Sequence, residues 1–201
     1  MGFMTGLNGM LDGLVTNRTP HVHIFNEIKP SKQQPASLYK ELENNMNVVH
    51  SIKPKNMPLK VRNAMPIMNH LKKDERVVGI TAQVQAQVFY IAGAIELNGV
   101  ISGIDPLKEK ELFNFGDYIV DGEPDDLKNN INGILLGRGV AKKMSLKVGD
   151  RIQLGTSKGE IIPLNIVGFY QSGLAEVDNV QSYVNMATAQ RILGENKSYI
   201  T

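Results

Sequence analysis

The sequence lacks groups on which several kinds of protein depend. Its 201 residues include no cysteine, which excludes disulfide bonds and thiolate chemistry. Its longest apolar runs, such as residues 88–95, have the length of a β-strand and fall short of the ~20 residues that a membrane-spanning helix needs. We therefore expect the fold to be held by an apolar core without covalent cross-links.

The sequence also has no excess of one charge. There are 22 basic and 20 acidic residues, which gives a net charge of +2, and the two signs are interspersed. A protein that binds a phosphate backbone presents a concentrated basic surface. The one basic cluster, residues 53–60, is rich in proline and contains no aromatic residue. These features exclude nucleic acid as a partner.

The composition that remains is typical of a folded globular protein. Hydrophobic residues make up 42% of the chain and charged residues 21%, so global disorder is excluded. A chain of this length forms one domain or two small subdomains.

A glycine motif at residues 137–142 is placed where a strand is expected to turn into a helix, which is the context of a phosphate-binding loop. However, Lys142 replaces the third glycine of the dinucleotide fingerprint. Glu160, the acidic residue at about the right spacing, lies in an expected hairpin. We therefore interpret Gly137 and Gly139 as glycines that permit a tight turn, and we assign no cofactor.

Three further patterns could carry chemistry. His21 and His23 alternate in an expected strand and could supply half of a metal site, but no carboxylate shares their spacing. No serine stands in a Gly-x-Ser-x-Gly elbow. The acidic cluster fits a solvated turn and the start of a helix, where acidic side chains are favoured. We assign no catalytic or metal-binding residue and rank an enzyme that uses this cluster last. The cluster comprises Asp117, Asp121, Glu123, Asp125 and Asp126.

The first third of the chain has weak patterns. Residues 1–15 have helical spacing despite four glycines, which predicts either a surface helix or the end of a helix that begins earlier. Residues 20–26 alternate as a half-buried strand would, and a short helix is expected at residues 36–44. A further helix is expected near residues 63–73, with its start delayed so that Pro66 stands in the first turn.

Residues 77–90 have the clearest period in the chain. Apolar residues alternate with Gly79, Thr81, Gln83, Gln85 and Gln87, which predicts one long antiparallel strand with a solvated face. The next apolar run is interrupted by Asn98 and Gly99. Since Asn-Gly between apolar runs is a strong hairpin signal, we expect a hairpin turn at this dipeptide.

The last half of the chain alternates short helices and strands. We expect helices from Pro106 to about residue 113, at the turn of residues 121–126, at 138–144 and at 187–193, the last of them ended by Gly194. We expect strands at residues 118–120, 133–136 and 183–185, and a pair formed by 151–154 and 161–169 across a turn at 155–159.

Seven short blocks, in order along the chain, resemble the extracytoplasmic domain of bacterial ABC-transporter permeases of the lipoprotein-releasing (LolC/LolE) and MacB type. They span nearly the whole sequence, and their weight lies in the ordered set, since each block alone is short. The blocks are GFMTGL at 2–7, PHV at 20–22, SGIDP at 102–106, GILLGRGVA at 133–141, LKVGDRI at 146–152, IVG at 166–168 and YVNMATAQ at 183–190.

The resemblance implies an α+β fold with two lobes. A mixed α/β membrane-proximal lobe would comprise residues 1–76, of which 1–15 would continue a transmembrane helix. An inserted, mainly β lobe would comprise residues 77–182. Residues 183–201 would begin an incomplete return to the membrane-proximal lobe.

The resemblance also implies a function without catalysis in this chain. The domain would lie on the periplasmic or extracellular side of the cell membrane, held there by flanking helices. It would couple ATP hydrolysis on a separate ATPase subunit to the export or release of a lipoprotein or lipid-like cargo. Its partners would be that ATPase, a permease partner in a homo- or heterodimer, and a periplasmic protein. The alternative is a soluble protein- or peptide-binding module with no transport role.

One segment departs from the lipoprotein-releasing members, in which a long hook-like hairpin recruits a periplasmic lipoprotein carrier. The matching segment here, residues 155–163, is a tight turn, which speaks against recruitment by this route. The candidate partner-binding residues are in this turn and on the expected solvated strand face. They are Thr156, Ser157, Lys158, Gln83, Gln85 and Gln87.

Overall fold

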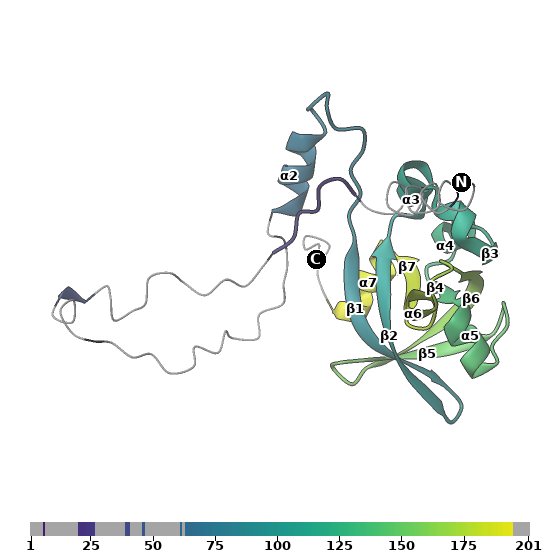
Figure 1. Cartoon of the computed structure of the whole chain (residues 1–201). Helices are drawn as coiled ribbons and strands as arrows, with labels where there is room; N and C mark the ends of the chain where they lie inside the picture. Colours follow the sequence, from purple (N-terminus) through teal and green to yellow (C-terminus); the bar gives the residue numbers. More distant parts are fainter. Residues whose placement is uncertain are drawn as a thin grey trace.

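The computed structural model describes residues 6, 20–26, 39–40, 46, 61 and 63–194 (Figure 1). Within these residues the chain forms one large mixed β-sheet with short helices around it, which confirms the α+β class. The strands are β1 (Val84–Ala92), β2 (Ile95–Ile104), β3 (Ile119–Asp121), β4 (Gly133–Gly137), β5 (Arg151–Thr156), β6 (Ile161–Tyr170) and β7 (Gln181–Asn185). The helices are α2 (Ala64–Leu71), α3 (Pro106–Phe113), the 3-10 helix η3 (Phe115–Tyr118), α4 (Pro124–Asn129), α5 (Arg138–Met144), α6 (Ala175–Asp178) and α7 (Met186–Leu193).

The sheet closes on itself. The strand order is β3-β6-β4-β7-β2-β1-β5, and β5 also pairs with β6, so six strands form a ring and β3 adds to β6 outside it. The pairs β2–β7 and β4–β6 are parallel, and the other pairs are antiparallel. The parallel β2–β7 pair brings strands from both ends of the region 84–185 next to each other.

The main core lies inside the ring. All six ring strands contribute fully or almost fully buried side chains to one apolar cluster, and α5 and α7 add Val140, Ala141, Met144, Ala189 and Ile192 to it. A second cluster lies on the opposite face, where Phe115 of η3 and Leu127 of α4 pack with Leu135 and Tyr170. Successive strand residues point to opposite faces, so Leu135 belongs to the second cluster while its neighbours belong to the first.

The long strand expected at residues 77–90 is only partly correct. The alternation is confirmed from Val84 to Tyr90, where buried and exposed residues alternate without exception. Residues 77–83 form no strand, and Val78, which was expected on the apolar face, is 98% exposed. This segment runs between α2 and β1 and has other contacts, described below.

The hairpin turn expected at Asn98 and Gly99 is wrong. The turn between β1 and β2 is at Gly93 and Ala94, where Gly93 adopts a positive φ of 61°. Gly99 lies inside β2 and pairs with Val88. A Cβ atom at Gly99 would lie 1.9 Å from Cε2 of Tyr90, so this glycine makes room for a buried ring and not for a turn.

The elements expected after residue 105 are confirmed, with small shifts at their ends. Helix α5 has the predicted bounds, β4 is buried throughout, and Gly194 ends α7 in a left-handed conformation with a φ of 65°. The sequence patterns did not predict η3 and α6, which are a single turn each.

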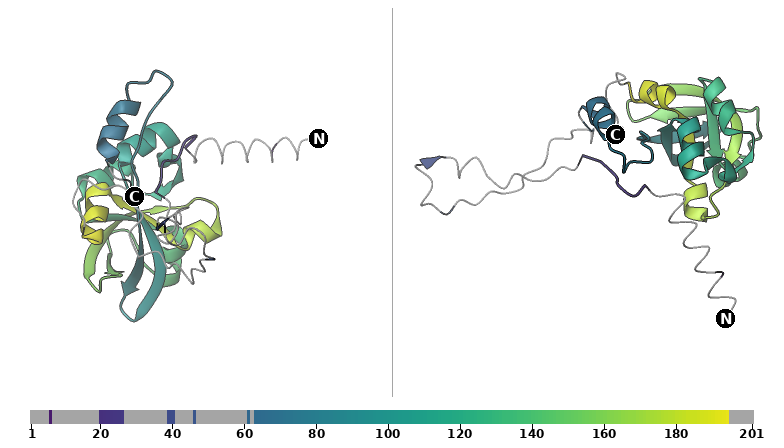
Figure 2. Two further views of the ribbon diagram at one scale, coloured as in Figure 1. Left: turned by 90° about the vertical axis from the view of Figure 1, so that its left-hand side faces the viewer. Right: turned by 90° about the horizontal axis from the view of Figure 1, so that it is seen from above.

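The expectations for the first third fall largely outside the described residues, including the helices at 1–15 and 36–44. The strand expected at residues 20–26 is wrong, because these residues form no strand and all are exposed. Helix α2 is confirmed, with Pro66 as its third residue. It stands at the end of the molecule opposite to the tip of the β1–β2 hairpin, which two views show (Figures 1 and 2).

The expected boundary at residues 182 and 183 falls within β7. Tyr183 and Val184 pair with β2 and with β4, so this part of residues 183–201 belongs to the same sheet as residues 84–170. The division of the chain into two lobes stays a prediction.

Candidate partner-binding surface

The two sets of predicted partner-binding residues are far apart in the sequence, but β1 and β5 bring them together. Val88 pairs with Thr156 at the end of the β1–β5 ladder. Gln87, which precedes Val88 on β1, and Ser157, which follows Thr156 just beyond the end of β5, are both exposed. Residues of the two sets therefore lie on one surface.

The side chain of Gln83 has mainly a structural role. Its Nε2 donates a hydrogen bond of 3.1 Å to Oγ of Ser102, a fully buried side chain of β2. The same hydroxyl accepts a second hydrogen bond of 2.6 Å from Nε2 of Gln181 on β7. Gln83 thus satisfies a buried polar group, whereas Gln85 and Gln87 are exposed.

Two residues of the β5–β6 turn also have structural contacts. The side chain of Thr156 is buried, and its Oγ1 accepts hydrogen bonds from the backbone N–H groups of Lys158 at 3.3 Å and Glu160 at 3.2 Å. Nζ of Lys158 donates to the carbonyl of Leu193 at 2.6 Å. The last carbonyls of a helix carry partial negative charge, so Lys158 is well placed at the end of α7.

Apolar side chains that are not among the predicted partner-binding residues extend this surface. Phe89 pairs with Gly155, and Gly155 pairs with Ile161, so the three lie in one row across β1, β5 and β6. Phe89 is 42% exposed and Ile161 is 60% exposed. The signal in the sequence was the period of two, since Phe89 follows Gln85 and Gln87 on the same face. We call Gln85, Gln87, Phe89, Ser157 and Ile161 the outer β1–β5 face.

The glycine motif between β4 and α5 is a packing feature. A Cβ atom at Gly137 would lie 2.5 Å from the carbonyl oxygens of Asp178 and Gln181. A Cβ atom at Gly139 would lie 2.3 Å from Oδ1 of Asn179. The segment between α6 and β7 therefore occupies the space in front of α5, which is the place that a phosphate would need.

The acidic cluster is also explained by local structure. Asp121 forms an ion pair of 2.9 Å with Arg138, and Asp125 lies 3.7 Å from Nζ of Lys110. Oδ2 of Asp126 accepts a hydrogen bond of 2.9 Å from the backbone N–H of Glu123 at the start of α4. These contacts fit the interpretation of the acidic cluster as a solvated turn that is followed by the start of a helix.

Neither a metal centre nor a membrane span is present in the part of the chain that the structure describes. His23 stacks on Phe25 with ring centroids 5.3 Å apart, outside any strand. No group of three His, Asp or Glu side chains in the described ranges could hold a metal ion. Among the same residues, no helix has both the length and the apolar character to cross a membrane.

Known proteins are similar to this chain both in sequence and in fold. The family model of the MacB-like periplasmic core domain matches residues 1–201. The lipoprotein-releasing system transmembrane protein LolC of Neisseria meningitidis serogroup B is 29% identical over 110 residues, which are 50% of this chain and 26% of that protein. The chain thus spans about a quarter of the length of this curated relative.

Two solved structures have a similar fold. The extracellular domain of the ABC-type transporter YknZ from Gram-positive bacteria matches with a TM-score of 0.52 and 14% identity, over 70% of each chain. The periplasmic region of MacB from Actinobacillus actinomycetemcomitans matches with a TM-score of 0.51 and 13% identity, over 71% of this chain and 63% of that one.

These identities are low, so the two structures support the fold alone. The family model, in contrast, covers the whole chain, and the ordered blocks of the sequence agree with it. The chain belongs to the family of MacB-like periplasmic core domains, which are domains of ABC transporter permeases and not enzymes.

Proposed function

We propose that this chain is the extracytoplasmic domain of an ABC permease subunit that couples cytoplasmic ATP hydrolysis to the export or release of a lipoprotein or lipid-like cargo. The observation that carries the proposal is the family match over residues 1–201. The similarity to LolC, a protein of a lipoprotein-releasing system, supports the proposed cargo class. In this function the domain lies in the periplasm or outside the cell, with flanking helices in the membrane.

The role of the domain is mechanical. ATP is hydrolysed on a separate ATPase subunit, and the resulting movement of membrane helices reaches the outer side through this domain. The closed ring of six strands around one core suits such a role, because a packed interior deforms little and transmits displacement. The proposed lobes at residues 1–76 and 77–182 would be the parts that move relative to each other.

Affinity purification of the full-length protein from detergent-solubilised membranes tests this function. We expect an ABC ATPase subunit and a permease partner to co-purify in stoichiometric amounts. Recovery of the protein with a soluble partner alone, and without an ATPase, would contradict the transport role.

The second candidate function is a soluble protein- or peptide-binding module, and the outer β1–β5 face favours it. A variant with Phe89→Ala and Ile161→Ala removes the exposed apolar row, while Ile95→Ala removes an equally exposed residue near the hairpin tip. If the face binds a partner, the double variant loses co-purification at unchanged melting temperature and the control retains it. Equal recovery of partners by both variants would remove this candidate.

A further inference from the structure

The segment between α2 and β1 contacts the rest of the domain through alternate residues. Gly79, Thr81 and Gln83 face α3 and β2, although the sequence pattern placed them on a solvated strand face. Val78 on the other side is 98% exposed, and Ile80 and Ala82 are half-buried. Burial does not alternate here, since Gly79 is exposed like Val78 and residues 80–83 are all half-buried, so the segment is not a strand with one buried face.

The first contact of this segment is apolar. A Cβ atom at Gly79 would lie 2.2 Å from Cδ2 of Leu112, so the backbone of Gly79 lies directly against this side chain of α3. Any larger residue at position 79 would displace the segment or the leucine.

The second contact is a hydrogen bond of 2.9 Å from the hydroxyl of Thr81 to Oε1 of Glu109 on α3. Burial raises the pKa of the Glu109 carboxyl, the Thr81 hydroxyl lowers it, and the nearby Asp105 raises it further. The cations on the same helix have partners of their own, since Lys108 pairs with Asp105 at 3.4 Å and Lys110 with Asp125 at 3.7 Å. Thr81 is thus the hydrogen-bond donor to the Glu109 carboxylate among the described residues.

The third contact is the hydrogen bond from Gln83 to Ser102 described above. All three contacts involve side chains of the segment or of its neighbours. Among the described residues, no backbone hydrogen bond joins residues 78–82 to the sheet. Single hydrogen bonds of this kind contribute only ~1 kcal/mol net, so residues 79–83 can separate from α3 without unfolding the ring.

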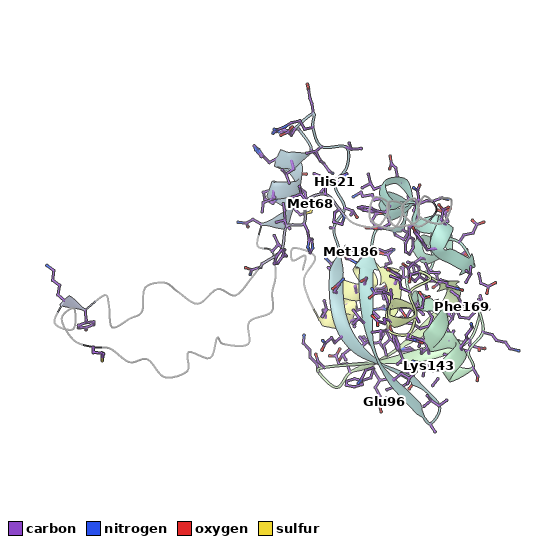
Figure 3. The ribbon with its side chains drawn as sticks, in the orientation of Figure 1. His21, Met68, Glu96, Lys143, Phe169 and Met186 are labelled. Carbon is purple, nitrogen blue, oxygen red and sulfur yellow. The ribbon has the colours of Figure 1, made fainter. Side chains whose placement is uncertain are left out.

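The segment joins two parts of the domain that lie apart. Helix α2 lies at one end of the molecule and the β1–β2 hairpin with Glu96 at the other, as the labels of Met68 and Glu96 show (Figure 3). Residues 72–83 connect α2 to β1 along the chain.

We propose that residues 79–83 and their contacts with Leu112, Glu109 and Ser102 form a releasable clasp, whose closed state transmits movement of α2 to the ring and whose opening uncouples them. This inference rests on the proposed transport function. The clasp is the contact through which we propose that movement passes from α2 to the ring. We refer to it as the 79–83 clasp.

Hydrogen–deuterium exchange on the full-length transporter in nanodiscs tests the clasp. We expect amides of residues 109–113, which are hydrogen-bonded within α3 beneath the clasp, to exchange about tenfold faster in the nucleotide state in which the clasp is open than in the state in which it is closed. Residues 88–91 of β1, which pair with strands on both sides, serve as the matched segment and are expected to exchange equally in both states.

Variants separate the clasp from general flexibility. Thr81→Val removes the hydrogen bond to Glu109 at nearly constant shape, and Leu112→Ala removes the apolar contact with Gly79. We expect fast exchange of residues 109–113 in both nucleotide states of the double variant, and an intermediate rate in Thr81→Val alone. Thr81→Val keeps the test valid if Leu112→Ala reduces folding.

The two proposals fail in different ways. If exchange in residues 63–71 responds to vanadate while exchange in residues 109–113 is the same in both states, the clasp is wrong and the transport role stands. If no part of the extracytoplasmic domain responds to vanadate in a complex that hydrolyses ATP, the mechanical transport role is wrong, and the clasp with it.

Discussion

Tyr90 and Gly99 determine how β1 and β2 pair at the centre of their ladder. The Tyr90 side chain is fully buried, and its hydroxyl lies 3.1 Å from the carbonyl oxygens of Val100 and Val180. The ring covers Gly99 on the neighbouring strand, where any side chain would overlap with it. An Asn-Gly dipeptide normally predicts a turn, but here the need of a buried aromatic ring for space explains the glycine.

Replacing Gly99 by alanine tests this explanation. The added methyl group would force the Tyr90 ring and its two hydrogen bonds to move, so we expect a loss of ~1–3 kcal/mol in the free energy of unfolding, measured by urea denaturation. Gly116→Ala is the matched control, because the nearest atom to its Cβ is 3.8 Å away. Equal stability of the two variants would show that Gly99 is not required for packing.

Glu109 gives a prediction for the dependence of stability on pH. Its pKa is raised in the folded state, mainly by burial, so the protonated form is favoured by folding. The stabilisation from this proton is present at low pH and is lost as the pH rises through the folded-state pKa. Glu109→Gln retains an acceptor for Thr81 without the charge. We therefore expect the melting temperature of the variant, relative to that of the natural chain, to be higher at pH 8 than at pH 4. An equal difference at both pH values would contradict this.

At the scale of elements, the β5–β6 turn is connected to the end of α7. Thr156 organises the turn through its hydroxyl, and Lys158 reaches the carbonyl of Leu193. The short turn thus has a structural function at the position where the lipoprotein-releasing members are expected to have a longer hairpin. Its candidate role in partner binding stays a prediction that rests on Ser157 and on the neighbouring strand face.

Removing the Lys158 amine tests the connection. Lys158→Ala takes a cation away from the C-terminal end of α7, so we expect amides of residues 190–193 to exchange roughly two- to fivefold faster. Ser157→Ala changes an exposed neighbour on the same turn and is expected to leave this exchange unchanged. Identical exchange in both variants would show that the contact with Leu193 has no energetic weight.

The sequence predicts the elements of residues 105–194 well, for physical reasons that can be named. Val140, Ala141 and Met144 have helical spacing, and Gly194 ends α7 in the conformation that glycine favours. Residues 77–83 were misassigned because an alternating pattern shows that the chain is extended, but not whether its backbone has a partner strand. The outer β1–β5 face could not be predicted as one surface, because it depends on a β1–β5 pairing between residues more than 60 positions apart.

At the scale of the whole molecule, the described residues form a closed ring of strands, and helix α2 lies apart from this ring (Figure 1). The ring has one core to which all six strands contribute, and α2 is joined to it by a segment whose contacts are made by side chains. A rigid body with a separately attached helix suits a domain that transmits movement.

We propose that α2 moves relative to the ring during ATP hydrolysis. Measuring the distance between α2 and the ring in two nucleotide states tests this movement directly. Because these 201 residues contain no cysteine, Lys72→Cys and Gln153→Cys provide a single pair of spin-label sites within them, at exposed positions at the end of α2 and on β5. In the full-length complex reconstituted in nanodiscs, pulsed electron paramagnetic resonance measures the distance between the labels. We expect vanadate trapping to shift the main distance by roughly 5 Å relative to the nucleotide-free state. An unchanged distance distribution in a complex that hydrolyses ATP would contradict it.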